Sequence, residues 1–211
     1  MRGVFITFEG LDGSGKSTHL KRAVEWLEAQ GKSVVVTREP GGTALGAELR
    51  RLFLEPGWRV ADGTVELLLV FASRRQHLLE VIDPALALGQ WVLCDRFTDS
   101  TVAYQGFGRG VPLPDIRLVE RLATGSRRPD RTLLFDLPAE LARERGHSPK
   151  RRDSPEGIDR LDAEELEFYQ RVRQGYLSLL EQEPERITRI DSSGDRELTA
   201  EQVRLTLAQL L

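Results

Sequence analysis

The sequence lacks the cysteines that build disulfide frameworks and the long apolar runs that span membranes. Its 211 residues include one cysteine, one methionine and three histidines. A single cysteine excludes any disulfide within the chain, which fits the reducing cytoplasm where we expect the protein to reside. The longest uninterrupted apolar run covers residues 67–72, whereas a bilayer span needs roughly 20 residues. We therefore expect no membrane partner.

Strong charge of either sign is also missing. The net charge is −3, with 30% charged and 40% hydrophobic residues, as is usual for a globular protein. Without an excess of basic residues, we expect no nucleic-acid partner. The length predicts a single domain, residues 1–211, with a substantial core. The first apolar run begins close to Met1, so we expect no signal peptide.

Short apolar runs rich in β-branched residues alternate with helical patterns along the chain. Strands that are apolar throughout and separated by helices are typical of a parallel sheet covered on both faces. We predict an α/β fold in which a five-stranded parallel sheet carries helices on both faces. The predicted strands are residues 4–8, 34–37, 91–94, 133–137 and 187–190.

Three of the predicted helical segments can be described in more detail. Residues 62–89 are predicted to form one long helix or a broken pair. A capped amphipathic helix is predicted from Asp162 to about Glu183, and a closing helix turns Val203 and Leu207 inward. Ligands of such sheets bind at the carboxyl ends of the strands, so the residues that follow each strand carry the functional argument.

A glycine-rich loop follows the first predicted strand and precedes a helix that ends near Gly31. Glycines accept the positive-φ turns that point successive N–H groups into one concavity, and the helix N-terminus adds positive potential. This context predicts a seat for a triphosphate, with a lysine on the β- and γ-phosphates and a serine hydroxyl on Mg²⁺. The predicted ATP-binding residues are Gly10, Leu11, Asp12, Gly13, Ser14, Gly15, Lys16 and Ser17.

The third strand runs directly into Asp95 and Arg96. At the carboxyl end of that strand, a carboxylate can organise Mg²⁺ and a guanidinium can clamp phosphate. Thr101, Tyr104 and Gln105 follow at three- and four-residue spacing, which predicts one helix face that reads a base and a sugar, with ordinary surface polarity as the alternative.

Charged residues elsewhere permit two interpretations. Arg38 and Glu39 follow the second strand and form either part of a site or a salt-bridged loop. Arg74 lies within the long helix, where a solvated face is the alternative. Residues 143–160 form a basic insert broken by glycine and proline, and we predict a lid that closes over anionic ligands, rather than a nucleic-acid patch or a solvated loop.

The motifs together resemble those of the bacterial thymidylate kinases, which are P-loop nucleoside monophosphate kinases. The resemblance covers essentially the whole chain. It implies the reaction ATP + dTMP → ADP + dTDP, Mg²⁺ and a homodimer. It is carried by the stretches FEGLDGSGKS at 8–17, TREPGGT at 37–43, DRF at 95–97 and AYQG at 103–106.

The resemblance also implies roles for individual residues. Asp12 would lie near the acceptor's sugar and phosphate, Ser17 and Asp95 would serve the metal, and Tyr104 would crowd the 2′ position of the sugar. The loop holds no arginine between Gly10 and Lys16, so a lid arginine should supply the catalytic charge. The implied catalytic residues are Asp12, Lys16, Arg96, Arg143, Arg145 and Arg152. The implied dTMP-binding residues are Arg38, Glu39, Arg50, Phe71, Arg74, Arg96, Thr101, Tyr104 and Gln105.

One position departs from the family pattern. Family members commonly have an aromatic residue four positions before the arginine that contacts the base, and this chain has Val70 there, followed by Phe71. Either Phe71 stacks on the base through a shifted register, or stacking is weaker.

Two other functions are compatible with a phosphate loop. One is a P-loop kinase for another nucleotide or a deoxynucleoside, although a nucleoside kinase needs a general base where a monophosphate needs arginines. The other is a GTP-type switch, which usually has an Asn-Lys-x-Asp motif that this sequence lacks.

Overall fold

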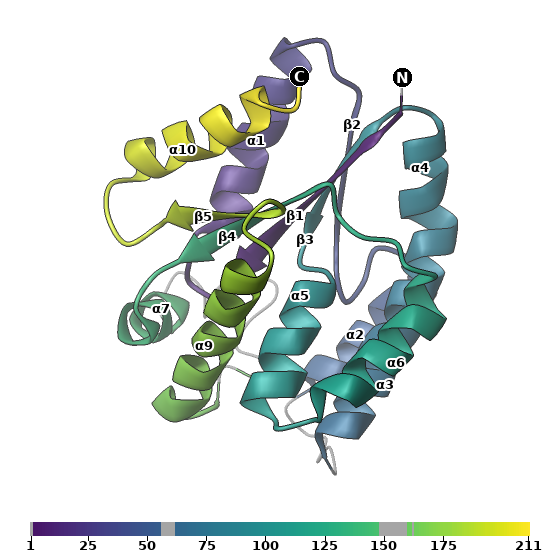
Figure 1. Ribbon diagram of the computed structural model, residues 1–211, viewed down its shortest axis with the longest axis vertical. Helices are drawn as coiled ribbons and strands as arrows, with labels where there is room; N and C mark the ends of the chain where they lie inside the picture. Colours follow the sequence, from purple (N-terminus) through teal and green to yellow (C-terminus); the bar gives the residue numbers. More distant parts are fainter. Residues whose placement is uncertain (1, 56–61, 148–159, 162) are drawn as a thin grey trace.

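Five parallel strands form the centre of the molecule. The computed structural model describes residues 2–55, 62–147, 160–161 and 163–211. The strands pair in the order β2-β3-β1-β4-β5, and every pairing is parallel. Figure 1 shows this sheet between two sets of helices, as predicted. The strands are β1 (Val4–Gly10), β2 (Val34–Arg38), β3 (Trp91–Asp95), β4 (Arg131–Asp136) and β5 (Ile187–Asp191).

The central strands are apolar on both faces because helices cover both sides of the sheet. Phe5, Ile6 and Phe8 of β1 are buried, although they point alternately to opposite faces. By contrast, β2 is an edge strand, and Val36 is half exposed. All five predicted strands are confirmed, with ends that shift by one or two residues.

Helices connect consecutive strands, as parallel pairing requires. One face of the sheet is covered by α1 and α10, whose residues Leu20, Leu27, Val203 and Leu207 pack on Phe135 and its neighbours. The helices are α1 (Lys16–Ala29), α2 (Ala44–Leu54), α3 (Gly63–His77), η1 (Leu78–Ile82), α4 (Asp83–Ala87), α5 (Thr98–Thr101), η2 (Val102–Gly108), α6 (Leu113–Thr124), α7 (Ala139–Gly146), α9 (Leu166–Gln182) and α10 (Arg196–Ala208).

The segment at 62–89 is one helical rod rather than a broken pair. A π-helical turn, η1, joins α3 directly to α4. The N-terminus is capped by Asp62, whose carboxylate accepts from the N–H groups of Thr64 and Val65. The second long helix differs from the prediction at its start. It begins at Leu166 instead of Asp162, which lies outside the described residues, and ends as expected at Gln182.

The sheet order places three functional loops together. Because β1 lies between β3 and β4, the loop after β1 is next to the residues that follow β3. The end of β2 is beside β3, and Arg38 pairs with Asp95 in the strand register. The carboxyl ends of β1, β2 and β3 therefore form one edge, where the sequence placed its candidate site.

Two further predictions concern the rest of the chain. Cys94 is buried and unpaired, as expected. Within the part of the chain that the structure describes, no helix is long and apolar enough to cross a membrane. Arg143 and Arg145 belong to the last turn of α7, whereas Arg152 and most of the predicted lid lie outside the described residues.

Candidate active site

The loop between β1 and α1 has the backbone that its glycines predict. Gly10, Gly13 and Gly15 all have positive φ, at 134°, 81° and 86°. A side chain at Gly10 would meet the carbonyl oxygen of Phe135 at 2.3 Å, and one at Gly13 would meet that of Ala142 at 2.4 Å. Glycine is therefore required at these two positions by both conformation and space.

Lys16 folds back over this loop. Its Nζ donates to the carbonyl oxygens of Gly10 (3.0 Å) and Leu11 (2.8 Å). Burial, together with the nearby positive charge of Arg96, lowers the pKa of Lys16 to about 8. The ammonium group is thus destabilised in the free protein, and an anionic ligand in the loop would restore its ordinary pKa.

Arg96 extends from the end of β3 to the same loop. Its backbone has φ of 72°, a left-handed conformation that is rare outside glycine and costs about 1–3 kcal/mol. The guanidinium donates from Nη1 to the carbonyl oxygen of Gly10 (2.9 Å) and from Nη2 to Asp12 Oδ1 (2.9 Å). It also lies over the ring of Tyr104, 4.9 Å from the centroid. The strained backbone thus aims one fixed positive charge at the phosphate loop.

A buried carboxylate, that of Glu9, organises the far side of Arg96. It accepts from the backbone N–H of Phe97 (2.6 Å), the hydroxyl of Ser100 (2.5 Å) and the hydroxyl of Tyr176 (3.1 Å). Ser100 and Tyr176 in turn each accept a hydrogen bond from Arg96 Nη1, at 3.1 Å. Burial raises the pKa of Glu9 to about 7.

Ser17 and Asp95 are suited to a hard cation. The Ser17 hydroxyl donates to Asp95 Oδ2 over 3.2 Å. Asp95 Oδ1 is buried and has no hydrogen-bond partner among the described residues. An unpaired carboxylate oxygen beside a hydroxyl matches the oxygen ligands that Mg²⁺ prefers, with phosphates completing the shell. The residues present therefore fit this ion.

The second half of the site is built around Arg74. This arginine is fully buried, so it does not lie on a solvated helix face. Nε donates to Glu39 Oε2 (2.5 Å), and Nη2 donates to Thr101 Oγ1 (3.0 Å) and the carbonyl oxygen of Phe97 (3.1 Å). Nη1 has no partner among the described residues. Arg74 thus holds a buried donor that needs an acceptor from a ligand.

Glu39 is an internal residue of the site. Besides Arg74, it contacts His77 Nδ1 at 2.9 Å, and His77 Nε2 lies 2.5 Å from Thr37 Oγ1. Glu39 is therefore salt-bridged, as one of the two interpretations has it, and it is also fully buried. Arg38 is exposed at the mouth of the site.

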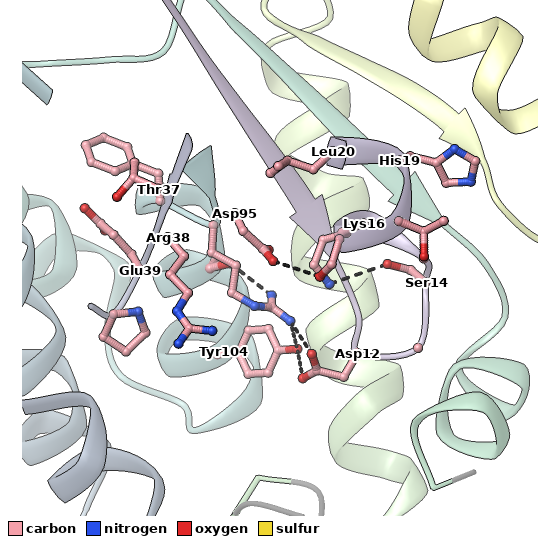
Figure 2. A pocket seen from close by; sticks show the side chains of 18 of the residues that line it. Asp12, Ser14, Lys16, His19, Leu20, Thr37, Arg38, Glu39, Asp95 and Tyr104 are labelled. Carbon is pink, nitrogen blue, oxygen red and sulfur yellow. Dashed lines mark hydrogen bonds and ion pairs between the residues drawn. The ribbon is translucent and has the colours of Figure 1, made fainter. Parts of the chain in front are cut away.

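One cavity of about 1350 Å³ joins the phosphate loop to the surroundings of Arg74. This exceeds the roughly 300–1,000 Å³ of typical single-ligand pockets. Figure 2 shows Asp12 and Tyr104 beside one another in this cavity, with Lys16 and Asp95 nearby. Predicted residues that line it are Asp12, Gly13, Ser14, Gly15, Lys16, Ser17, Arg38, Glu39, Arg50, Arg74, Asp95, Arg96, Thr101, Tyr104, Gln105 and Arg145.

Phe71 is not among the lining residues. It is buried with Leu67, Val111 and Ile116 and stacks on the guanidinium of Arg74, 4.6 Å from the ring centroid. Instead, Val70 reaches the cavity, together with Phe53 from α2. Phe71 therefore does not line the cavity, because the helical register turns its ring toward Ile116 and Ala123 of α6.

Of the two implied catalytic arginines of the lid that the structure describes, Arg145 lines the cavity and Arg143 does not. Arg145 donates to the carbonyl oxygens of Ser192 (2.8 Å) and Ser193 (3.0 Å), in the loop between β5 and α10. Arg143 is exposed on the same helical turn and does not line the cavity.

Sequence reasoning missed several residues of the site. Glu9, Glu66, His77 and Tyr176 were given no role in a site. A charged residue inside the apolar run of β1 was a usable signal for Glu9. No local signal marks Tyr176, whose contact with Glu9 spans 167 positions.

A parallel sheet, a phosphate loop after its first strand and one cavity lined by arginines together define a P-loop phosphotransferase of the nucleoside monophosphate kinase type. A family model described as thymidylate kinase matches residues 8–203. The chain belongs to the thymidylate kinase family.

Relatives and a solved structure agree with this assignment. The chain is 47% identical to a thymidylate kinase of Desulfovibrio desulfuricans over 211 residues, covering 99% of this chain and 96% of that one. It is 50% identical to one from Chromobacterium violaceum, covering 91% and 87%. The crystal structure of thymidylate kinase from Ehrlichia chaffeensis is similar, with a TM-score of 0.77, 34% identity and 99% coverage of both chains.

Proposed function

We propose that the protein transfers the γ-phosphoryl group of ATP to dTMP, forming ADP and dTDP for nucleotide biosynthesis. The observation that carries this proposal is the single cavity that joins the phosphate loop to the buried, unpaired donor of Arg74. The half of the cavity at the phosphate loop suits a triphosphate. The half around Arg74 suits a base with an exposed hydrogen-bond acceptor. Family membership supports this substrate pair over another nucleotide or a deoxynucleoside.

Different residues bind the phosphate donor, ATP, and the phosphate acceptor, dTMP. The loop N–H groups and Lys16 bind the β- and γ-phosphates of ATP. Arg96 lies between the two halves, so its guanidinium contacts the acceptor phosphate and neutralises charge on the transferred group. Asp12 holds Arg96 in that position. Because phosphoryl transfer needs alignment and charge stabilisation more than covalent help, these roles suffice for the protein's part.

Mg²⁺ would be held by Ser17 and Asp95, on the evidence of the unpaired Asp95 oxygen. When bound, it would supply positive charge that offsets the negative charge of the phosphates. On the side of α7, we propose Arg145 as the arginine that complements the transferred phosphoryl group. Its cavity position supports it over Arg143.

The acceptor half recognises a pyrimidine nucleotide. Arg74 Nη1 donates to a carbonyl oxygen of the base, and Thr101 and Gln105 lie beside it. Phe53 and Val70 provide the apolar surface under the base, in place of the aromatic residue that position 70 lacks. Tyr104 is packed against Arg96, where its ring crowds the 2′ position of the sugar.

The test is an ADP-release assay with purified protein, ATP and Mg²⁺. Each common nucleoside monophosphate and deoxynucleoside is offered in turn at equal concentration. We expect the highest kcat/KM with dTMP. A preference for UMP, CMP, GMP or a deoxynucleoside would contradict the proposal.

We also propose that the protein works as a homodimer in the cytoplasm. Adjacent helices α3 and α6 carry exposed leucines, among them Leu68 (55% exposed) and Leu122 (83% exposed). A second copy would remove these side chains from water. The buried, unpaired Cys94 suits a reducing compartment. Sedimentation should show a dimer that Leu122→Asp converts to a monomer, while the matched Leu205→Asp on α10 does not.

A further inference from the structure

Glu66 is a buried carboxylate outside the residues that touch either proposed substrate. It lies in the first turn of α3 and is 1% exposed. Its Oε1 accepts from Arg109 Nε (3.0 Å) and lies 2.8 Å from Arg160 Nη1. Its Oε2 accepts from Gln105 Nε2 at 2.9 Å. Two arginines hold one oxygen of this carboxylate in place, and the other oxygen accepts from Gln105.

This contact decides which way the Gln105 amide points. The Glu66 oxygen accepts from the NH₂ group of Gln105, because the amide oxygen cannot donate a hydrogen bond. The carbonyl oxygen of Gln105 therefore faces away from Glu66. Because Gln105 is buried and lines the cavity, that oxygen is the polar atom that Gln105 offers to a bound base.

Arg74 provides a hydrogen-bond donor, whereas Gln105 provides an acceptor. Its Nη2 donates to Thr101 Oγ1, and its buried Nη1 has no partner among the described residues. Arg74 lines the same cavity as Gln105. The site thus offers one donor and one acceptor. Thymine and uracil present the complementary edge, with the O4 acceptor beside the N3–H donor, whereas cytosine presents an N4 donor beside an N3 acceptor.

We infer that Glu66 is a positioning residue that sets the selectivity against cytosine by fixing the Gln105 amide. The inference rests on the proposed function. Were the amide free to rotate, its NH₂ group could serve N3 of cytosine, and the site would lose the part of its discrimination that Gln105 provides, leaving only the Arg74 donor to oppose the N4 donor of cytosine. Uracil shares the thymine edge, so this device leaves the choice between dTMP and dUMP unchanged.

The experiment compares kcat/KM for dTMP, dUMP and dCMP in the native protein and in Glu66→Gln. A glutamine at 66 can also donate, so it no longer dictates the Gln105 orientation. We expect the dTMP:dCMP ratio to fall by roughly tenfold or more, while the dTMP:dUMP ratio stays within about twofold. A folded Glu66→Gln variant with an unchanged dTMP:dCMP ratio would overturn the inference, and so would an equal fall in both ratios.

A double-mutant cycle separates this role from a general structural one. If Glu66 acts through Gln105, then adding Glu66→Gln to Gln105→Met produces no further fall in the dTMP:dCMP ratio. An additional fall of the same size as in the single variant would show that Glu66 acts elsewhere, and it would overturn the inference.

Two variants complete the design. Glu164→Gln is the matched control, because Glu164 pairs with Arg109 Nη2 at 2.6 Å and is not a partner of Gln105; we expect its dTMP:dCMP ratio to equal the native one. Should Glu66→Gln fail to fold, Glu66→Asp keeps the charge beside the arginines but withdraws it from Gln105, and the same fall is expected. A native protein that does not phosphorylate dTMP refutes the proposed function, whereas native activity with an unchanged ratio in the variants refutes only the role of Glu66.

Discussion

Arg96 Nη2 lies 2.9 Å from Asp12 Oδ1, and this ion pair joins the end of β3 to the phosphate loop. The two residues are 84 positions apart in sequence. Arg96 reaches Asp12 from a left-handed backbone conformation, and the hydroxyls of Ser100 and Tyr176 contact its other nitrogen. The guanidinium is thus fixed before any substrate binds, and preorganised charge of this kind stabilises a transition state more than it stabilises a ground state.

Arg96→Ala should reduce turnover with dTMP by about a hundredfold or more while ATP still binds. The reason is that the substitution removes the charge between the two halves of the cavity but leaves the loop and Lys16 in place. Steady-state kinetics and ATP titration measure the two effects. The control is Arg51→Ala, at an exposed arginine paired with Glu48, which should behave as native. Unchanged dTMP kinetics in Arg96→Ala would contradict the role of Arg96.

Arg145→Ala and Arg143→Ala form a matched pair from one helical turn. Arg145 lines the cavity, and Arg143 is exposed outside it. We expect kcat to fall about a hundredfold in Arg145→Ala and to stay within about twofold in Arg143→Ala. Equal losses in the two variants would indicate that the basic segment acts only through its overall charge.

ATP binding should weaken as the pH rises above 8. The pKa of Lys16 in the free protein is lowered to about 8 by burial, so above that pH the lysine becomes neutral and loses its attraction for phosphate. We expect the Kd for ATP, measured calorimetrically, to increase between pH 7.5 and about 9.5 by roughly tenfold. In Lys16→Arg, which stays charged over this range, the Kd should be higher but should not change with pH. A flat profile in the native protein would refute the prediction.

Glu9 should make the protein less stable as the pH rises from 5 to 8. Burial raises its pKa from 4.5 to about 7, so between these values the folded protein binds a proton that the unfolded chain has released. The contribution is fully present below 4.5 and is lost as the pH rises through 7, and it amounts to about 3 kcal/mol.

Urea unfolding of Glu9→Gln tests this linkage. The variant has no titrating group at position 9. Its free energy of unfolding, relative to that of the native protein, should therefore increase as the pH increases. The control is Glu185→Gln, at an exposed position, whose difference from native should not change with pH. A constant difference for Glu9→Gln would disprove the raised pKa.

Phe53→Leu should increase the KM for dTMP about fivefold or more, with little change in the KM for ATP. Phe53 lines the acceptor half of the cavity with Val70, and losing the ring removes apolar contact area from the base. Phe71→Leu is the matched control, because Phe71 is as deeply buried but does not line the cavity. An increase in the KM for dTMP in Phe71→Leu alone would restore Phe71 as the residue under the base.

The sequence by itself determined the phosphate loop and the strands. Gly10, Gly13, Gly15, Lys16 and Ser17 are contiguous, so their conformation follows from local chemistry, in which glycine permits the positive φ that other residues resist. The apolar runs were equally informative, because a strand buried on both faces has few polar positions. Family membership followed from the same short motifs.

Only the tertiary structure decided which residues face the cavity. Val70 and Phe71 are neighbours in sequence, and the sequence left open which of them faces the base. In the structure Val70 lines the cavity and Phe71 packs against α6, because the packing of α3 on α6 and η2 sets its rotation. The side-chain hydrogen-bond partners of Arg74, Glu66 and Tyr176 lie at least 23 positions away. Such contacts depend on how the helices pack on the sheet, and no local pattern in the sequence encodes them.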